Sequence, residues 1–322
     1  MRLRLTAPCV LGLAILSMLL APTSARAVIL YQSETRDTSA PTGAFANSGW
    51  QYEGEFGGHT ATAISKKFII TAGHLQHPVG TNFVFNGELH RTVQVWGDPT
   101  SDLRIYQVVG SLFTVAPFVK DGREGNRTTM IFGRGTQRGD PVTVNGVLKG
   151  WQWGTSDSVL SWGRNAITNI AKGQHGEDLL RMTFDANGGS NEGMITGGDS
   201  GGGVFVKQGT LWKLAGVNFS VDGPFSYNQD GSGSFSAAIF DRSQLWTNGY
   251  GFDSSNTVTP AASYATRTFP RLTWISDVLN GRVAPGVPDN GNGGAPTPEP
   301  AAGVLVTSAS FLLISRRRRR RD

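Results

Sequence analysis

Three short segments of the sequence carry side chains that could cooperate in acyl transfer. His74 follows an apolar run, Asp102 precedes another, and Ser200 lies in the glycine-rich stretch 196–203. A serine on a sharp turn offers a nucleophile, and the backbone N–H groups beside it can stabilise an oxyanion. A histidine is neutral at pH 7 unless perturbed and can take up and return a proton, while a carboxylate can orient it.

Each segment also has an ordinary structural interpretation. The glycine-rich stretch could be a hairpin, because glycine is common wherever a backbone turns sharply. His74 could be a surface or core histidine, and Asp102 could be a turn residue that begins a strand. The three segments therefore have to be judged together and in the context of the elements that hold them.

Most of those elements are predicted to be β-strands. Short runs rich in β-branched and aromatic residues recur every ~8–12 positions between turn residues, which indicates a barrel or sandwich. Helical spacing is found only at about 270–280, where Leu272, Ile275 and Val278 share one face. The 322 residues, 43 of them glycine, suffice for a sizeable core with many turns.

The order His, Asp, Ser matches that of chymotrypsin. On the motifs TAGH, SDLRIY and GDSGG, together with 214–217, 263–267 and Trp274-Ile275, residues 50–280 resemble a chymotrypsin-like, trypsin-fold serine protease. The resemblance implies an all-β fold of two packed six-stranded antiparallel β-barrels with a short C-terminal helix. The first barrel is expected within 28–125, with His74 and Asp102, and the second within 126–281, with Ser200.

The resemblance also implies roles for individual residues. Ser200 would attack the scissile carbonyl, His74 would accept its proton, and Asp102 would orient the imidazole. The backbone N–H groups of Gly198 and Ser200 would form the oxyanion hole. No metal or organic cofactor is expected.

Two features depart from the family's pattern. The chain has no Ile-Val-Gly-Gly string to supply an amino group for Asp199, which we expect to act as a structural latch. Removal of a signal peptide could supply that amine at Val28, or another group could satisfy Asp199. The resemblance implies a substrate pocket with Met194 at its base, Val221 on its wall and Ala262 and Ser263 behind. No aspartate stands at the Met194 position, so we expect a weak apolar P1 preference rather than one for Lys or Arg, although the insert 222–259 would overhang the pocket.

Both ends of the chain are predicted to direct export. Residues 1–27 combine two arginines, an apolar run and an Ala-Arg-Ala cleavage site, as in a signal peptide. Residues 282–296 are expected to form a flexible linker. Residues 297–322 contain Pro-Glu-Pro, a short apolar stretch and six arginines, and resemble the PEP-CTERM sorting signal of Gram-negative bacteria.

The charge of the chain belongs to these ends. The full chain carries +5, and removing three arginines at the N-terminus and the net +4 of the tail leaves −2. We therefore expect no nucleic-acid partner. The single cysteine, Cys9, lies inside the predicted signal, so the remaining chain would have no disulfide.

The sequence thus predicts a secreted or cell-envelope serine endopeptidase of a Gram-negative bacterium. Its expected partners are protein or peptide substrates and the export and sorting machinery. It is expected to be a monomer that contacts the membrane transiently through its tail. The alternative is a catalytically idle trypsin-fold module of the cell envelope or matrix.

Overall fold

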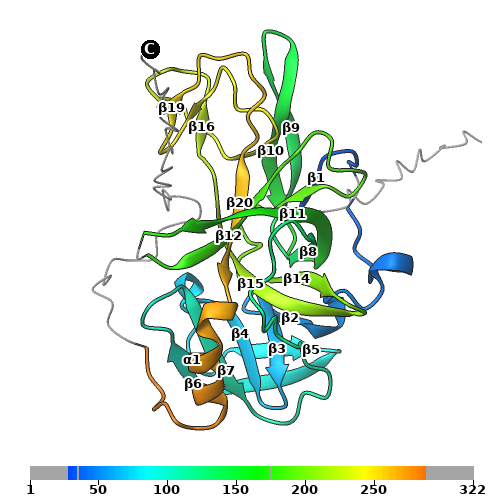
Figure 1. Ribbon diagram of the computed structural model, residues 1–322, viewed down its shortest axis with the longest axis vertical. Helices are drawn as coiled ribbons and strands as arrows, with labels where there is room; N and C mark the ends of the chain where they lie inside the picture. The colour runs from blue at the N-terminus through cyan, green and yellow to red at the C-terminus, as the bar shows by residue number, and fades with distance from the viewer. Residues whose placement is uncertain (1–27, 35, 175, 288–322) are drawn as a thin grey trace, which may run out of the picture.

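The structure of the chain is a computed structural model that describes residues 28–287, except for residues 35 and 175. The predicted signal peptide, the predicted sorting tail and the linker from residue 288 lie outside the described residues. Two β-barrels are stacked along the long axis of the molecule (Figure 1).

The first barrel is closed by six antiparallel strands in the order β2-β3-β4-β7-β6-β5. Large side chains such as Phe56, Ile69 and Tyr106 fill its interior and are fully buried. The strands are β2 (Glu53–Phe56), β3 (His59–Ser65), β4 (Phe68–Ala72), β5 (Asn82–Phe85), β6 (Glu88–Gly97) and β7 (Leu103–Val108).

The second barrel is also closed by six antiparallel strands, in the order β11-β12-β20-β15-β14-β8. The two closed barrels confirm the predicted fold class. The strands are β8 (Thr128–Gly133), β11 (Ser161–Lys172), β12 (Asp178–Thr183), β14 (Gly203–Gln208), β15 (Leu211–Val221) and β20 (Ala262–Arg267).

Other elements lie around the barrels. The helix α1 (Leu272–Leu279) buries Ile275 and Val278 against a core cluster that includes Leu103 and Leu214 of the two barrels. The remaining strands are β1 (Ile29–Leu30), β9 (Thr136–Val144), β10 (Val147–Ser156), β13 (Gly193–Met194), β16 (Phe225–Ser226), β17 (Ala237–Ile239), β18 (Trp246–Thr247) and β19 (Gly251–Phe252). The 3-10 turns are η1 (Gly43–Phe45), η2 (Trp50–Tyr52), η3 (Gly73–Leu75) and η4 (Phe269–Arg271).

Two segments at the ends of the described chain pack differently from the predicted division. Strand β1 pairs with β13, so the range 28–125 assigned to the first barrel begins with residues that pack into the second. The predicted flexible linker begins with residues fixed to β6. The Trp96 Nε1–H donates to the Val283 carbonyl at 3.0 Å, and Gly286 exchanges backbone hydrogen bonds with Val95 and Gly97.

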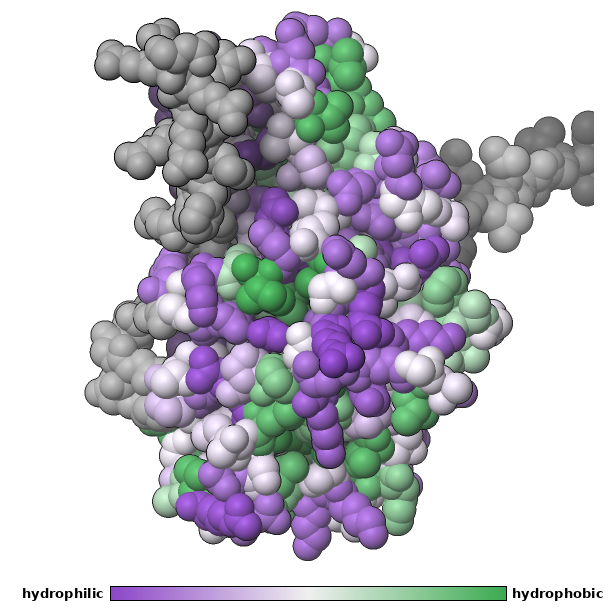
Figure 2. All heavy atoms as spheres, in the orientation of Figure 1, coloured by the Kyte–Doolittle hydropathy of each residue, from purple (hydrophilic) through white to green (hydrophobic). Residues whose placement is uncertain are grey.

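The surface of the molecule is mixed in character. On the face shown in Figure 2, hydrophobic residues form small patches among hydrophilic ones. Among the described residues, no helix combines the length and the apolar character needed to cross a membrane.

Candidate active site

His74 and Asp102 are brought together by the pairing of β4 with β7. Ala72 lies opposite Leu103 in that ladder, so the residues just beyond β4 meet the residue just before β7. The Gly73 N–H donates to the Asp102 carbonyl at 3.1 Å. A side chain at Gly73 would place its Cβ 2.9 Å from Asp102 Oδ1, which explains why glycine is needed there.

Both carboxylate oxygens of Asp102 contact His74. The backbone N–H of His74 donates to Oδ1 at 2.6 Å, and His74 Nδ1 lies 2.7 Å from Oδ2. The Asp102 side chain is 16% exposed and that of His74 is 29% exposed, so the pair lies at the rim of the protein interior. Because Asp102 fixes both the backbone and the ring of His74, the imidazole presents Nε2 in one direction.

That direction leads to Ser200. His74 Nε2 lies 2.9 Å from Ser200 Oγ, which is within hydrogen-bonding distance. The three side chains therefore form one continuous line of contacts from Asp102 Oδ2 to Ser200 Oγ, across the two barrels. Such a line can hold the imidazole tautomer that accepts a proton from the hydroxyl.

The loop that carries Ser200 connects β13 to β14 and is shaped by glycines. Gly198 and Gly201 have φ values of +91° and +82°, in the left-handed region that favours glycine. A Cβ at Gly201 would lie 2.2 Å from Thr71 Oγ1. The first barrel therefore approaches the loop too closely for any other residue type at this position.

Asp199 is fully buried directly behind Ser200. Its Oδ1 accepts the Gly135 N–H at 2.8 Å, and its Oδ2 accepts the N–H and hydroxyl of Thr196 at 2.7 and 3.0 Å. The backbone N–H of Val28 is a further donor. Desolvation outweighs these hydrogen bonds and raises the pKa of Asp199 to about 6.

Val28 reaches Asp199 because the first described residues insert into the second barrel. Val28, Ile29 and Leu30 are each at most 3% exposed. Ile29 pairs with Met194, and Leu30 pairs with Gly193. The sequence left the partner of Asp199 open, and the structure brings the N–H of Val28 to it.

The predicted pocket residues lie on two different faces. Met194 and Val221 belong to one apolar cluster, whereas Ala262 belongs to another with Tyr264. The Ser263 hydroxyl accepts the Ile195 N–H at 3.2 Å, which directs it toward Met194 and away from Ala262. Of the four, Ala262 is thus separated from the other three by the alternation of side chains along β20.

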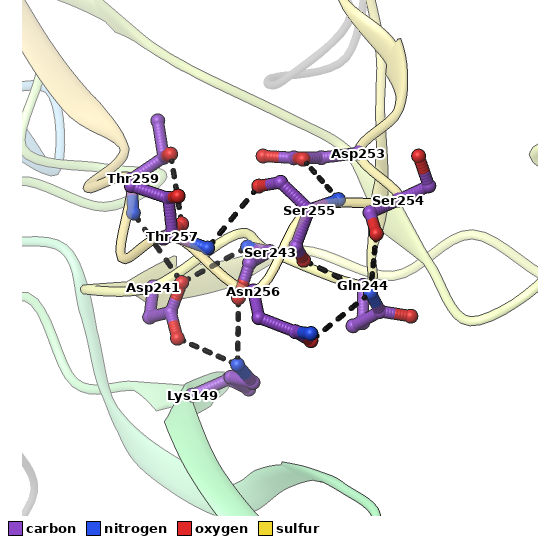
Figure 3. A network of polar contacts seen from close by, with 10 residues as sticks. All are labelled: Lys149, Asp241, Ser243, Gln244, Asp253, Ser254, Ser255, Asn256, Thr257 and Thr259. Atoms are coloured by element: carbon purple, nitrogen blue, oxygen red, sulfur yellow. Dashed lines mark hydrogen bonds and ion pairs between the residues drawn. The ribbon is translucent and has the colours of Figure 1, made fainter.

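The insert 222–259 is more ordered than its composition indicates. Its strand β17 extends the β9–β10 hairpin, and β16, β18 and β19 form a small sheet at the end of the second barrel remote from the first (Figure 1). Lys149 of β10 donates to Asp241 at 2.6 Å and to Ser243 at 2.8 Å, and all three are buried. Figure 3 shows that this lysine reaches up into a network that links the strand to the loops of the insert.

Several residues near the site carry no motif that could have identified them. The half-buried ring of Phe219 lies edge-on to His74, with centroids 5.8 Å apart. Asn218 hydrogen-bonds to the Ser200 loop from β15. An alternating apolar strand predicts such positions as core, so only the fold reveals their contact with the site.

Neither a metal cluster nor the detected cleft lies at His74, Asp102 and Ser200 in the described part of the chain. Among the residues that the structure describes, no three His, Cys, Asp or Glu side chains gather as they would around a metal ion. A cleft of about 510 Å³ between Trp50, Glu53, Glu55 and Arg134 is lined by none of His74, Asp102 and Ser200.

The two closed six-stranded barrels, with a histidine and a serine meeting between them, decide the fold. It is the trypsin-like serine protease fold. No protein-family model and no curated protein matches the chain. Solved structures similar to it include neuropsin, a serine protease of mouse brain, with 13% identity, a TM-score of 0.47, and coverage of 72% of this chain and 96% of that one.

A second similar structure is the HtrA-type protease AlgW with a decapeptide. It has 15% identity and a TM-score of 0.41, and the match covers 69% of this chain and 51% of that one. The chain therefore matches about half the length of AlgW.

Proposed function

We propose that this chain is a serine endopeptidase with a catalytic triad of Ser200, His74 and Asp102. The observation that carries the proposal is the continuous contact from Asp102 Oδ2 through the imidazole to Ser200 Oγ. In the proposed mechanism Ser200 Oγ attacks the peptide carbonyl while His74 Nε2 takes its proton. The N–H groups of Gly198 and Ser200 stabilise the oxyanion, and His74 then protonates the leaving amine. Water hydrolyses the acyl-enzyme by the same route.

A fluorophosphonate probe tests the nucleophile. Wild-type protein should be labelled at Ser200, and Ser200→Ala should not be labelled at all. Ser65→Ala, in which a serine at the end of β3 is lost, is the matched control and should react like the wild type. Absence of labelling in a folded wild-type protein would favour the idle binding module instead.

We propose an apolar P1 preference for the same site. Met194 lies in an apolar cluster with Val221, and neither can pair with a lysine or arginine side chain. The nearby carboxylate of Asp222 already accepts the Ala262 N–H and the Tyr264 hydroxyl, each at 2.9 Å. Cleavage of a peptide library should therefore favour apolar P1 residues, and a clear preference for Lys or Arg would contradict this assignment.

We propose that cleavage before Val28 completes the latch at Asp199. An α-amino group at Val28 would stand where its N–H now donates, and a buried carboxylate is stabilised by an opposite charge. Val28→Ile keeps such an amine and should retain activity, whereas one extra glycine before Val28 should lower it. A mature N-terminus found elsewhere by mass spectrometry would contradict this role, and so would equal activity of the proteins with and without the extra glycine.

Export, sorting at the envelope and a monomeric state remain proposals that rest on the sequence of the two ends and on its charge. Cell fractionation and light scattering of the purified protein test them. The expected results are full-length precursor in the cytoplasm, processed protein outside it, and a single monomeric species. Processed protein found only in the cytoplasm would contradict export.

A further inference from the structure

Asn218 is a fully buried amide in the middle of an apolar barrel strand. It lies on β15 between Val217 and the bulge that precedes Ser220. Burying an amide costs free energy unless its polar atoms are paired. The contacts of Asn218 therefore indicate why an amide is present at this position.

Those contacts converge on the loop that carries Ser200. The Asn218 Nδ2 donates to the Asp199 carbonyl at 3.1 Å and to the Phe132 carbonyl at 2.7 Å. Its backbone N–H donates to the Gly202 carbonyl at 2.8 Å, and its own carbonyl accepts the Gly201 N–H at 3.1 Å. One residue thus makes three hydrogen bonds to the three residues that surround Ser200 in sequence.

The close approach depends on the absence of a side chain at Gly202. A Cβ there would lie 1.9 Å from the Phe132 carbonyl oxygen and 3.0 Å from Asn218 Nδ2. The second glycine after Ser200 therefore provides the space through which the amide reaches the loop.

The bond to the Asp199 carbonyl has a geometric consequence for Ser200. The peptide unit is planar and trans, so its C=O and N–H point in opposite directions. Fixing the Asp199 carbonyl toward Asn218 fixes the Ser200 N–H on the other side of the same plane. That N–H is one of the two oxyanion donors in the proposed mechanism, and such donors act through their preorganisation.

The amide is not explained by stability alone. Its Oδ1 is buried and has no hydrogen-bond partner among the described residues, which offsets part of what the Nδ2 bonds contribute. We propose that Asn218 is a positioning residue, which orients the oxyanion donor of Ser200 by holding the Asp199–Ser200 peptide. This inference rests on the proposed function.

The barrel offers a matched control. Asn165 on β11 is likewise buried, and its Nδ2 also bridges two backbone carbonyls, those of Thr183 and Gly193, each at 2.9 Å. Replacing Asn218 with leucine removes two such hydrogen bonds from the barrel, and replacing Asn165 removes two similar ones together with the 2.6 Å bond from the Ala166 N–H to Asn165 Oδ1. Only Asn218→Leu removes a donor from the peptide that precedes Ser200, and it leaves the Asp199 carbonyl with the longer bond from the Gly202 N–H at 3.3 Å.

The test compares Asn218→Leu and Asn165→Leu with the wild type, using a cleaved peptide substrate and active-site titration. We expect kcat of Asn218→Leu to fall about 10- to 100-fold with KM changed less than about twofold, since loss of a whole oxyanion donor costs 10²–10³. The affinity for a peptide boronic acid, which mimics the oxyanion, should fall in parallel. Asn165→Leu, which also loses the Ala166 bond, should lose at least as much thermal stability and keep its kcat.

Asn218→Ser, which keeps one hydroxyl donor in a smaller side chain, covers the case in which the leucine variant does not fold. Its kcat should lie below that of the wild type. The inference is overturned if the folded Asn218 variants keep the wild-type kcat, or if Asn165→Leu loses kcat by the same factor. A wild-type protein that neither reacts with a fluorophosphonate nor cleaves peptides would overturn the proposed function and this inference with it.

Discussion

Glu53 lies at the junction of the two barrels as a buried acid, and within residues 28–287 as the structure describes them no cation is in hydrogen-bonding contact with it. Thr62 donates its hydroxyl to Oε1 at 2.9 Å, and the Gly203 N–H of the second barrel is another donor. The second oxygen, Oε2, has no hydrogen-bond partner in the part of the chain that the structure describes. Desolvation dominates over these bonds and over the more distant charge of Arg134, and it raises the pKa of Glu53 from 4.5 to about 8.

This raised pKa predicts a loss of stability with rising pH. Between pH 4.5 and about 8 the unfolded chain releases the Glu53 proton while the folded chain keeps it, so the free energy of unfolding falls. Each pH unit across that interval corresponds to 1.36 kcal/mol, which gives a ceiling of about 5 kcal/mol. Glu53→Gln mimics the protonated acid, so it should stabilise the protein relative to wild type at pH 8 and change it little at pH 4.5.

The assay is urea unfolding of the wild type and Glu53→Gln between pH 4.5 and 8. We expect the difference in free energy of unfolding to grow by about 2–4 kcal/mol over that range, below the ceiling because folded proteins relax around buried charges. Glu192 and Asp199 also have raised pKa values and contribute to both proteins equally. Glu55→Gln, a substitution at a neighbouring residue on β2, is the control. Its free energy of unfolding should fall with rising pH as that of the wild type does, so the same difference from Glu53→Gln should appear. A difference that stays constant with pH would refute the reasoning.

Three further substitutions have distinct expected outcomes. In Asp199→Asn, an amide NH₂ faces backbone N–H donors that the carboxylate accepted in a buried site. The kcat/KM, measured by steady-state kinetics at a known active-site concentration, should therefore fall at least about 100-fold although Ser200 is still present. Lys149→Met leaves the buried carboxylate of Asp241 with the Ser243 and Thr259 N–H donors but no cation, and should cost about 3–5 kcal/mol in denaturant unfolding. Adding Asp241→Asn, which removes the charge and keeps an oxygen for those two donors, should recover most of it. Gly201→Ala clashes with Thr71 and should abolish titratable active sites, whereas an unchanged titre would contradict the packing described.

The strands, the turned loop at Ser200 and the all-β class could be predicted from short stretches of the sequence. His74 and Asp102 each adjoin a strand with strong β character, so the pairing of β4 with β7 was sufficient to bring them together. The glycines around Ser200 marked a sharply turned loop, and the structure places left-handed backbone at two of them. Short alternating runs predicted an all-β chain, and the resemblance supplied the two barrels.

What could not be predicted depends on long-range packing. The run beginning at Val28 is too short to show a period, and only its burial in the second barrel explains it. The glycine- and serine-rich insert appeared to be a loop because the lysine that fixes it, Lys149, lies 92 residues before Asp241. Asn218 and Phe219 follow an ordinary strand pattern, and their contacts with the Ser200 loop and His74 occur at a register shift in β15 that no local pattern predicts.

The most direct test of the central claim is to trap the acyl-enzyme. Rapid acid quenching of the wild type with an activated ester of an apolar amino acid, followed by peptide mapping, should show the acyl group on Ser200. His74→Ala should reduce the rate of its formation by several orders of magnitude, because no base then faces the hydroxyl. An acyl group on another residue, or hydrolysis that survives Ser200→Ala, would contradict the account.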